Sequence, residues 1–274
     1  MVITLCAVFV HNIVAPSLYA QSLTASEESS ANLSTRLSLT TLLAKLAARV
    51  DRFEHALPDF VTTETFIQES YKNGKLIEHN NTISLLAGRQ LRVTRGNQVE
   101  LSFKELRQVQ SINGKLVKQK ELKLEGIQVG GAFSSILLAH FASRDQLDYL
   151  FELSTELHSL RGRPSYLLTF LSRPDHNGQY YLFNGKSYQS QQRGRAWIDA
   201  ETTEPLRIEY YELNLPKGFK SMFYAVDYAP IELGEESFTL PIAAITEVEE
   251  DKLVSRARHE YRDYKKFSTD VKID

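Results

Sequence analysis

The stretch Arg195–Glu212, RAWIDAETTEPLRIEYYE, decides the fold of this chain. Trp197 and Ile198 begin a pleated strand, and the residues of DAET (199–202) break it because their side chains hydrogen-bond their own backbone. In the return strand three residues share one face, alternating with polar or amphipathic neighbours: Leu206, Ile208 and Tyr210. The pattern of strand, tight turn and strand predicts an antiparallel meander.

Tight turns of the same kind are expected elsewhere in the chain. The tripeptide Asn-Gly-Lys occurs at Asn73–Lys75, Asn113–Lys115 and Asn184–Lys186, each time between segments rich in strand-forming residues. Asn-Gly readily adopts the two positive φ angles of a type I′ turn, so each copy predicts a β-hairpin. The copies are unevenly spaced and indicate no internal repeat.

Further strands are predicted wherever twofold alternation and β-branched or aromatic residues coincide. They are expected at Phe60–Tyr71, Thr82–Leu86, Arg89–Thr94, Val99–Val109, Leu116–Leu124, Gln146–Leu153, Ser165–Leu171, Tyr180–Phe183, Ser221–Tyr228, Phe238–Val248 and Leu253–Tyr261.

Two segments have helical spacing instead. Apolar residues recur at steps of three and four through Leu39–Leu57, with Ser38 as a plausible N-cap and Pro58 ending the helix. A second, shorter helix is predicted at Ala132–Ala142. We therefore expect an α+β, mainly β fold: a curved antiparallel sheet, or half-barrel, with an N-terminal helix and one short inserted helix packed on it.

The N-terminus indicates export. Residues 1–20 contain no charged side chain, carry an apolar run at Val2–Val10 and end with a small residue, Ala20, as signal peptides do. The alternative is a hydrophobic helix belonging to the fold. We expect a signal peptide over 1–20, a flexible lead-in over 21–35, one half-barrel domain over 36–274 and no membrane span in the mature chain. The only cysteine, Cys6, lies in the leader, so a mature chain would form no disulfide.

Composition and motifs exclude several functions. Thirty-two Lys and Arg against thirty-four Asp and Glu give a net charge of −2, which argues against nucleic acid as a partner. The seven histidines form no short metal-ligand spacing, and the chain has no nucleophile elbow or phosphate-binding glycine loop. We expect no cofactor, no metal and no enzymatic activity.

Clusters of charged residues are weaker candidates for a functional site. Asp199 with Glu201 and Glu204 could imitate a carboxylate pair for glycoside chemistry, but polar side chains are expected in a turn. The acidic cluster at Glu247–Asp251 is more simply a solvated hairpin tip. The segments RGR at 161–163 and 193–195 could grip an anionic headgroup, with solvated loops as the default expectation.

The order of elements resembles a known group of proteins. The segment Gly194–Glu209, with its Ile-Asp, polar turn and Pro-Leu-Arg, resembles periplasmic outer-membrane lipoprotein-sorting proteins and their lipid-carrier relatives. Leu57–Phe60, Leu160–Arg163 and the spacing of aromatic residues in Tyr261–Phe267 are similar to a group of uncharacterised exported bacterial proteins. The resemblance covers roughly Leu39–Phe267, although the leader here lacks basic residues. It implies a half-barrel whose helices close a hydrophobic cavity that accepts acyl chains, and it carries over no lipid-contacting residue.

Two functional hypotheses follow. The first is a non-enzymatic periplasmic or secreted binding or carrier protein for a lipidated or amphipathic ligand, with a lipid or a lipoprotein acyl chain as its partner. One apolar sheet face would then line the pocket. Its candidate ligand-binding residues are Tyr166, Leu168, Phe170, Leu206, Ile208 and Tyr210. The alternative is a structural or interaction module of the cell envelope, which has no ligand cavity and meets an envelope protein through strand edges or the acidic tip.

Overall fold

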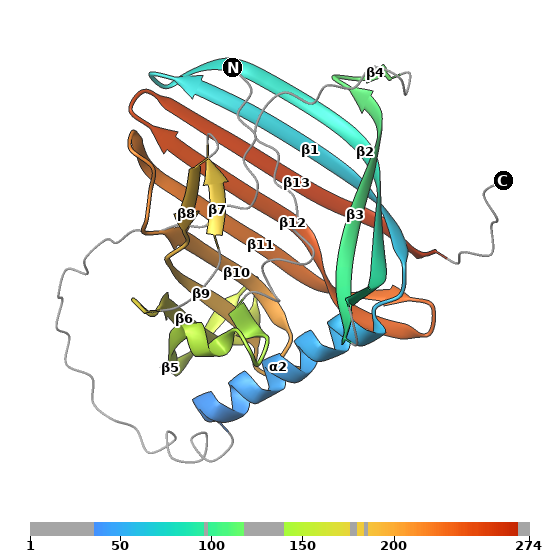
Figure 1. Cartoon of the computed structure of the whole chain (residues 1–274), viewed down its shortest axis with the longest axis vertical. Coiled ribbons are helices and arrows are strands. Elements are labelled where there is room, and N and C mark those ends of the chain that lie inside the picture. The colour runs from blue at the N-terminus through green and yellow to red at the C-terminus, as the bar shows by residue number, and fades with distance from the viewer. Residues whose placement is uncertain (1–35, 96–97, 118–139, 176–179, 184–185, 268–274) are drawn as a thin grey trace.

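The structure is a computed structural model, and it describes residues 36–95, 98–117, 140–175, 180–183 and 186–267 (Figure 1). The predicted leader, the predicted lead-in and the hairpin turn predicted at Asn184-Gly185 lie outside these residues. So does most of the helix predicted at Ala132–Ala142, of which only the last residues are described; His140 and Phe141 are helical.

An antiparallel sheet of eleven strands forms the body of the described chain, in the order β4-β3-β2-β1-β13-β12-β11-β10-β9-β6-β5. A separate two-stranded ribbon pairs β7 with β8. The strands are β1 (Phe60–Lys72), β2 (Lys75–Arg95), β3 (Gln98–Ile112), β4 (Lys115–Leu116), β5 (Tyr149–Leu160), β6 (Arg163–Ser172), β7 (Tyr180–Phe183), β8 (Lys186–Gln189), β9 (Gln192–Asp199), β10 (Pro205–Glu212), β11 (Phe219–Leu233), β12 (Glu236–Glu250) and β13 (Leu253–Lys266). The predicted mainly β, antiparallel fold class is confirmed.

Turn chemistry produces the hairpins. Asn73-Gly74 and Asn113-Gly114 have positive φ angles at both residues, 51° and 75° in the first pair and 49° and 77° in the second. These are the angles that a type I′ turn requires, so both predictions are confirmed. Arg161-Gly162 joins β5 to β6 with the same conformation, at 54° and 79°.

The helix α2 (Leu39–Ala56) begins and ends as predicted. The Ser38 Oγ accepts a hydrogen bond from the Thr41 backbone N–H at 3.2 Å, which satisfies one of the unpaired donors of the first turn. One stripe of the helix is buried: Leu42, Leu46, Val50 and Phe53. The stripe follows the three- and four-residue spacing of the sequence, which is why the helix lies flat on the sheet.

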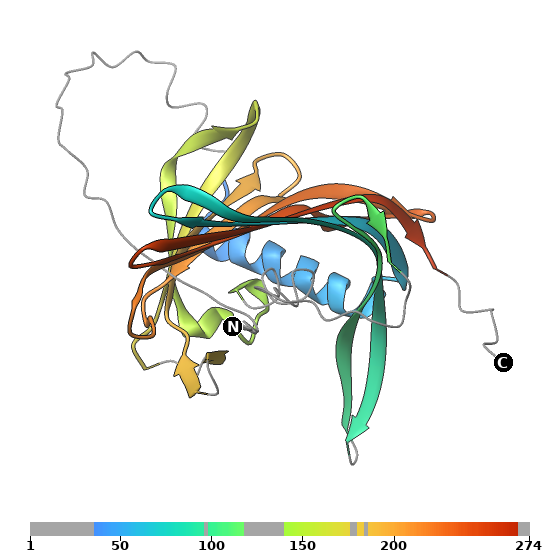
Figure 2. The ribbon, with the colours of Figure 1, turned by 90° about the horizontal axis from the view of Figure 1, so that it is seen from above.

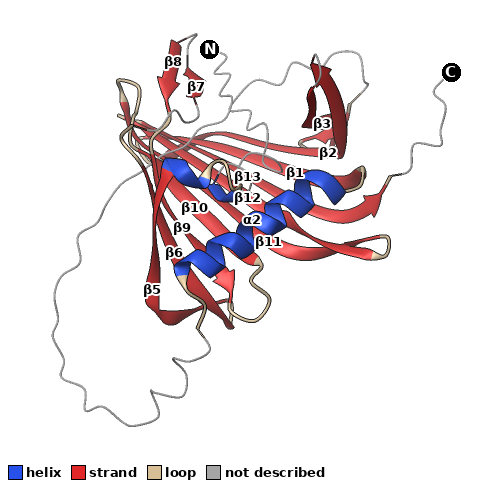
Figure 3. Cartoon of the chain, turned by 60° about the horizontal axis from the view of Figure 1, so that its bottom comes forward, coloured by secondary structure: helices blue, strands red, loops and turns tan. Residues whose placement is uncertain are grey.

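The sheet bends around α2, so that one face is concave and covered by the helix, as Figures 2 and 3 show from two directions. We call this the concave face and the opposite one the outer face. The buried core lies between α2 and the concave face, where Leu46 and Phe53 share one cluster with strand residues such as Ile208 and Tyr224. Within the described residues, no helix has the length and apolar character needed to cross a membrane.

Three local predictions need correction. The strands predicted at Thr82–Leu86 and Arg89–Thr94 are one strand, because the residues between them keep their pairing to β1 and β3. Gln146–Asp148 forms a 3-10 turn ahead of β5, since the Gln146 side-chain amide donates to the Leu43 and Phe141 carbonyls. Arg193–Arg195 is not a loop but lies in the first half of β9. Of the strand predicted at Leu116–Leu124, only Leu116 and Val117 are described; Leu116 belongs to β4 and Val117 does not.

Candidate functional site

The six predicted ligand-binding residues lie on β6 and β10, the two strands that flank β9, and are all buried. Those of β6 and β10 have exposed fractions between 0 and 6%. All except Leu206 belong to the core cluster that includes the α2 stripe. The structure therefore brings five of them together on the concave face, in the cluster that holds the α2 stripe, and buries Leu206 outside that cluster.

Aromatic rings fill the end of this face near β5. His140 is fully buried, and its ring centroid lies 4.6 Å from that of Phe170 and 5.1 Å from those of Tyr149 and Tyr210. The Gln192 Oε1 lies 2.7 Å from the His140 Nε2 and accepts a hydrogen bond from the Tyr149 hydroxyl at 2.9 Å. Burial raises the pKa of Tyr149 and of Tyr210, so both phenols stay protonated.

A pocket of about 630 Å³ lies across the outer face of the same strands. Strand register arranges its lining in two rows, each running across β5, β6, β9 and β10. The first row is mainly apolar: Leu150, Leu171, Arg193 and Tyr211. The second row is polar: Glu152, Thr169, Arg195 and Glu209. A volume of this size suits a small organic ligand, and the two rows make the pocket amphipathic. We call it the outer pocket.

Gly194 lies under the centre of the outer pocket, and its lack of a side chain shapes the site. A Cβ at this position would stand 2.3 Å from the Phe170 ring and 2.4 Å from the Glu209 carbonyl oxygen. The ring therefore lies directly against the β9 backbone, and Phe170 contributes to the pocket lining as well as to the core. Among the six predicted residues, Phe170 is the one that lines this pocket.

A ladder of ion pairs extends from the outer pocket along the outer face. The Arg195 Nε donates to one Glu209 oxygen at 2.5 Å, and the Arg207 Nε donates to the other at 2.8 Å. Arg207 then donates to both oxygens of Asp227 at 3.0 and 3.1 Å, and Asp227 also pairs with Arg161 at 2.7 Å. Burial alone would lower the pKa of Arg207, but Glu209 and Asp227 outweigh it and raise this pKa, so the guanidinium stays charged.

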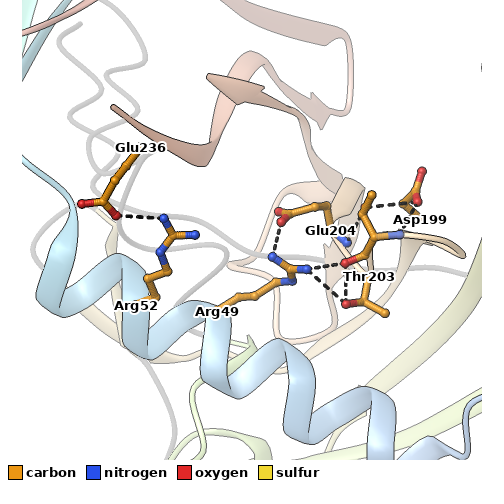
Figure 4. A network of polar contacts seen from close by, with 7 residues as sticks. Arg49, Arg52, Asp199, Thr203, Glu204 and Glu236 are labelled. Atoms are coloured by element: carbon orange, nitrogen blue, oxygen red, sulfur yellow. Dashed lines mark hydrogen bonds and ion pairs between the residues drawn. The ribbon is translucent and has the colours of Figure 1, made fainter. Parts of the chain in front are cut away.

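At the rim of the concave face, arginines of α2 reach the β9–β10 turn and the β11–β12 turn (Figure 4). Arg49 pairs with Glu204 and donates to the Thr202 carbonyl, while Arg52 pairs with Glu236 at 3.0 Å. Asp199 accepts hydrogen bonds from the Glu201 and Thr202 backbone N–H groups, as a turn residue does. These carboxylates therefore fix the turn and the helix, which confirms the turn interpretation of this segment.

A second charged cluster is buried on the concave face, at β1, β3 and β13. The Glu64 carboxylate accepts two hydrogen bonds from Arg107, at 2.7 and 3.1 Å, and lies 2.9 Å from the His259 Nδ1. Burial by itself would raise the pKa of Glu64. Hydrogen bonds and charges from His259 and Arg107 outweigh burial and lower this pKa to about 2. At neutral pH the Glu64 carboxylate is therefore ionised and buried beside the Arg107 guanidinium as a paired charge.

The remaining clusters behave as ordinary surface. The predicted acidic hairpin tip is confirmed, since β12 ends at Glu250 and β13 begins at Leu253, with Glu247 paired to Arg256 at 2.6 Å. Across the described ranges, no group of three His, Cys, Asp or Glu side chains could hold a metal ion.

Sequence reasoning missed most of the outer pocket. Its residues come from four strands, and only their register brings them together. One signal was present: Arg193 and Arg195 are two residues apart, so within a strand they lie on the same face.

Comparisons with known proteins give structural likeness only. No protein-family profile matches the chain, and no curated protein matches it. Several solved structures align with most of this chain at low identity, and three of them are the following. One is a DUF1329 family protein from Desulfovibrio piger, with 13% identity, a TM-score of 0.39, and coverage of 84% of this chain and 93% of that one.

The second is a LolA superfamily protein from Nitrosomonas europaea, with 11% identity, a TM-score of 0.36 and coverage of 82% and 94%. The third is an outer membrane lipoprotein-sorting protein domain from Vibrio parahaemolyticus, with 14% identity, a TM-score of 0.40 and coverage of 84% and 93%. The second and third belong by name to the lipoprotein-sorting group that the sequence resembles. At such TM-scores the strand order and register of this chain, not the neighbours, establish its fold.

Proposed function

We propose that this protein is a non-enzymatic periplasmic binding or carrier protein for a lipidated or amphipathic ligand. The binding domain would be residues 36–274, after removal of the leader. The observation that supports it is the outer pocket, which is open in the structure and combines an apolar row with a polar one. An amphipathic molecule could lay its chain on Leu150 and Leu171 and its polar end near Arg195 and Glu209. A ligand-free envelope module is not favoured, because such a module needs no pocket.

The concave face stays our second location for the same ligand, through Tyr166, Leu168, Phe170, Leu206, Ile208 and Tyr210. Access to it would require α2 to leave. The four buried residues of its stripe would then be exposed, at a cost on the order of 6 to 12 kcal/mol, from roughly 1.5 to 3 kcal/mol for each side chain. The outer pocket requires no such displacement, which is why we place the ligand there first.

Binding of N-phenyl-1-naphthylamine tests the proposal, since this neutral apolar probe brightens when it leaves water. We expect saturable brightening with the purified mature chain. Leu150→Glu should weaken probe affinity about tenfold, because a carboxylate would enter the apolar row. Leu157→Glu is the matched control, since it lies on the same strand with nearly the same exposure, 48% against 44%, outside the pocket lining.

The outcomes separate the two locations. Brightening that survives Leu150→Glu but weakens in Ile208→Val would place the probe on the concave face. No saturable brightening in the wild-type chain, together with no lipid copurifying with it, would overturn the proposed function.

A further inference from the structure

The ion-pair ladder has more positive than negative members. Arg195, Arg207 and Arg161 alternate with two carboxylates, Glu209 and Asp227, which leaves one positive charge in excess. Arg207 occupies the middle, has only 19% of its side chain exposed and donates to both carboxylates. The excess charge is therefore divided between the two ends of the ladder, Arg195 and Arg161, which are 53% and 54% exposed.

The negative charge of Glu209 is neutralised by its partners, so it does not repel an anion in the outer pocket. Each of its carboxylate oxygens accepts a hydrogen bond from a guanidinium, and only 8% of the side chain is exposed. Its negative charge is thus offset by Arg207 from outside the pocket and by Arg195 within it. The remaining charged lining residues are Arg193 and Glu152, which are opposite in sign. The lining itself holds two arginines and two glutamates, and the share of the Arg207 charge that reaches Glu209 from outside the pocket adds a positive contribution at the Arg195 end.

Arg195 is positioned to bind an anionic ligand group as well as to pair with Glu209. Its guanidinium lies over the Trp197 ring, with the central carbon 4.8 Å from the ring centroid, and its bond to Glu209 uses Nε. Stacking and the Nε bond hold the group in one orientation, which lowers the entropy lost when a ligand binds. Among the described residues, none accepts a hydrogen bond from the terminal N–H groups of Arg195, the fork that matches a carboxylate or phosphate.

The apolar row lies one step along the strands from this charge. Arg195 pairs with Thr169 across β9 and β6, and the next outward-facing pair in that direction is Arg193 with Leu171. Leu171 in turn pairs with Leu150, so two leucines adjoin each other at the β5 side of the pocket. An anionic group on Arg195 would therefore direct an attached chain across the strands onto these leucines.

We propose that the outer pocket selects anionic amphiphiles, molecules with a carboxylate or phosphate head on Arg195 and an alkyl chain on Leu171 and Leu150. The inference rests on the proposed function and adds the ligand's charge to it. Trp197 is the only tryptophan of the chain and lies beneath the proposed head site, so its emission reports binding there directly.

The test compares three ligands that share one alkyl chain: decanoate, decanol and decyltrimethylammonium, each below the concentration at which it forms micelles. Titrations follow Trp197 emission and the heat of binding. We expect decanoate to bind about tenfold or more tightly than decanol, the decyltrimethylammonium cation to bind most weakly, and added salt to weaken decanoate alone.

Arg195→Gln should remove the preference for decanoate while leaving decanol affinity within about twofold. Arg258→Gln, on β13 with 58% of its side chain exposed, is the matched control and should leave both affinities unchanged. Equal affinity for decanoate and decanol in the wild-type chain would overturn the charge preference and leave the proposed function standing. A preference that persists in Arg195→Gln would also overturn it. Failure of all three ligands to bind would overturn the selection of anionic amphiphiles, and together with no saturable brightening of N-phenyl-1-naphthylamine and no copurifying lipid it would overturn the proposed function as well.

Discussion

The two faces of β6, β9 and β10 use the same strands for opposite purposes. On the concave face, Leu168, Ala196 and Ile208 are fully buried beneath α2 and the aromatic cluster. On the outer face, the residues in between carry an ion-pair ladder beside an open pocket. The contrast shows that the protein buries the more apolar face of this sheet against its own helix. The face with mixed polar and apolar residues stays open for a ligand.

The largest expected effect compares two leucines of β6 that point to opposite faces. Leu168→Ala should lower the free energy of unfolding by about 3 kcal/mol, because it leaves a cavity in a fully packed core. Leu171→Ala on the outer face should cost less than about 1 kcal/mol, since that side chain is only half-buried. Urea unfolding measures both, and equal losses would contradict the distinction between a closed and an open face.

The second prediction concerns the charge buried on the concave face. The pKa of Glu64 is about 2 in the folded protein, below its ordinary value of 4.5. A lowered folded-state pKa contributes stability above the unfolded pKa that is lost as the pH falls. We therefore expect roughly 3 kcal/mol of unfolding free energy to disappear between about pH 4.5 and 2.

Denaturant unfolding between pH 7 and 2 isolates that contribution. Glu64→Gln should flatten the acid limb of the stability curve, since this variant has no carboxylate to protonate. Glu247→Gln should leave the acid limb of the stability curve unchanged, because the Glu247 carboxylate is 37% exposed and paired at the surface. An unchanged acid limb in Glu64→Gln would show that other groups govern acid unfolding.

The smallest effect concerns the attachment of α2 at the rim of the concave face. Arg49→Gln should cost about 1 kcal/mol, because Arg49 is mostly buried and bonds both Glu204 and the Thr202 carbonyl. Arg52→Gln should cost no more than a few tenths, since its partner Glu236 is 59% exposed and the pair is solvated. Thermal unfolding ranks the two variants, and the reverse order would mean that packing, not these contacts, anchors the helix.

Local patterns in the sequence predicted much of this fold. The spacing from Leu39 to Leu57 predicts α2 because a stripe of apolar residues has one stable place, against a sheet. Asn-Gly predicts the hairpins at residues 73 and 113 because the turn requires its φ angles. The alternation of apolar and polar residues in β10 also predicted correctly that Ile208 and Tyr210 lie on one face.

Features that depend on register could not be predicted in the same way. Leu150, Leu171, Arg193 and Tyr211 come from two hairpins, β5–β6 and β9–β10, which are adjacent in the sheet but separated in the chain by β7 and β8. The sequence of Arg193–Arg195 resembles a loop, and only its pairing to β6 and β10 shows that it is a strand with both guanidiniums on one face. The apolar residues singled out from the sequence therefore belong to the core on the concave face. The amphipathic pocket lies on the outer face of the same strands.

A crystal structure of the mature chain bound to decanoate tests the central claim most directly. We predict the alkyl chain on the outer face against Leu150 and Leu171, the carboxylate within hydrogen-bonding distance of Arg195, and α2 in the position described above. Decanoate found between α2 and the concave face, against Leu168 and Ile208, would contradict this account.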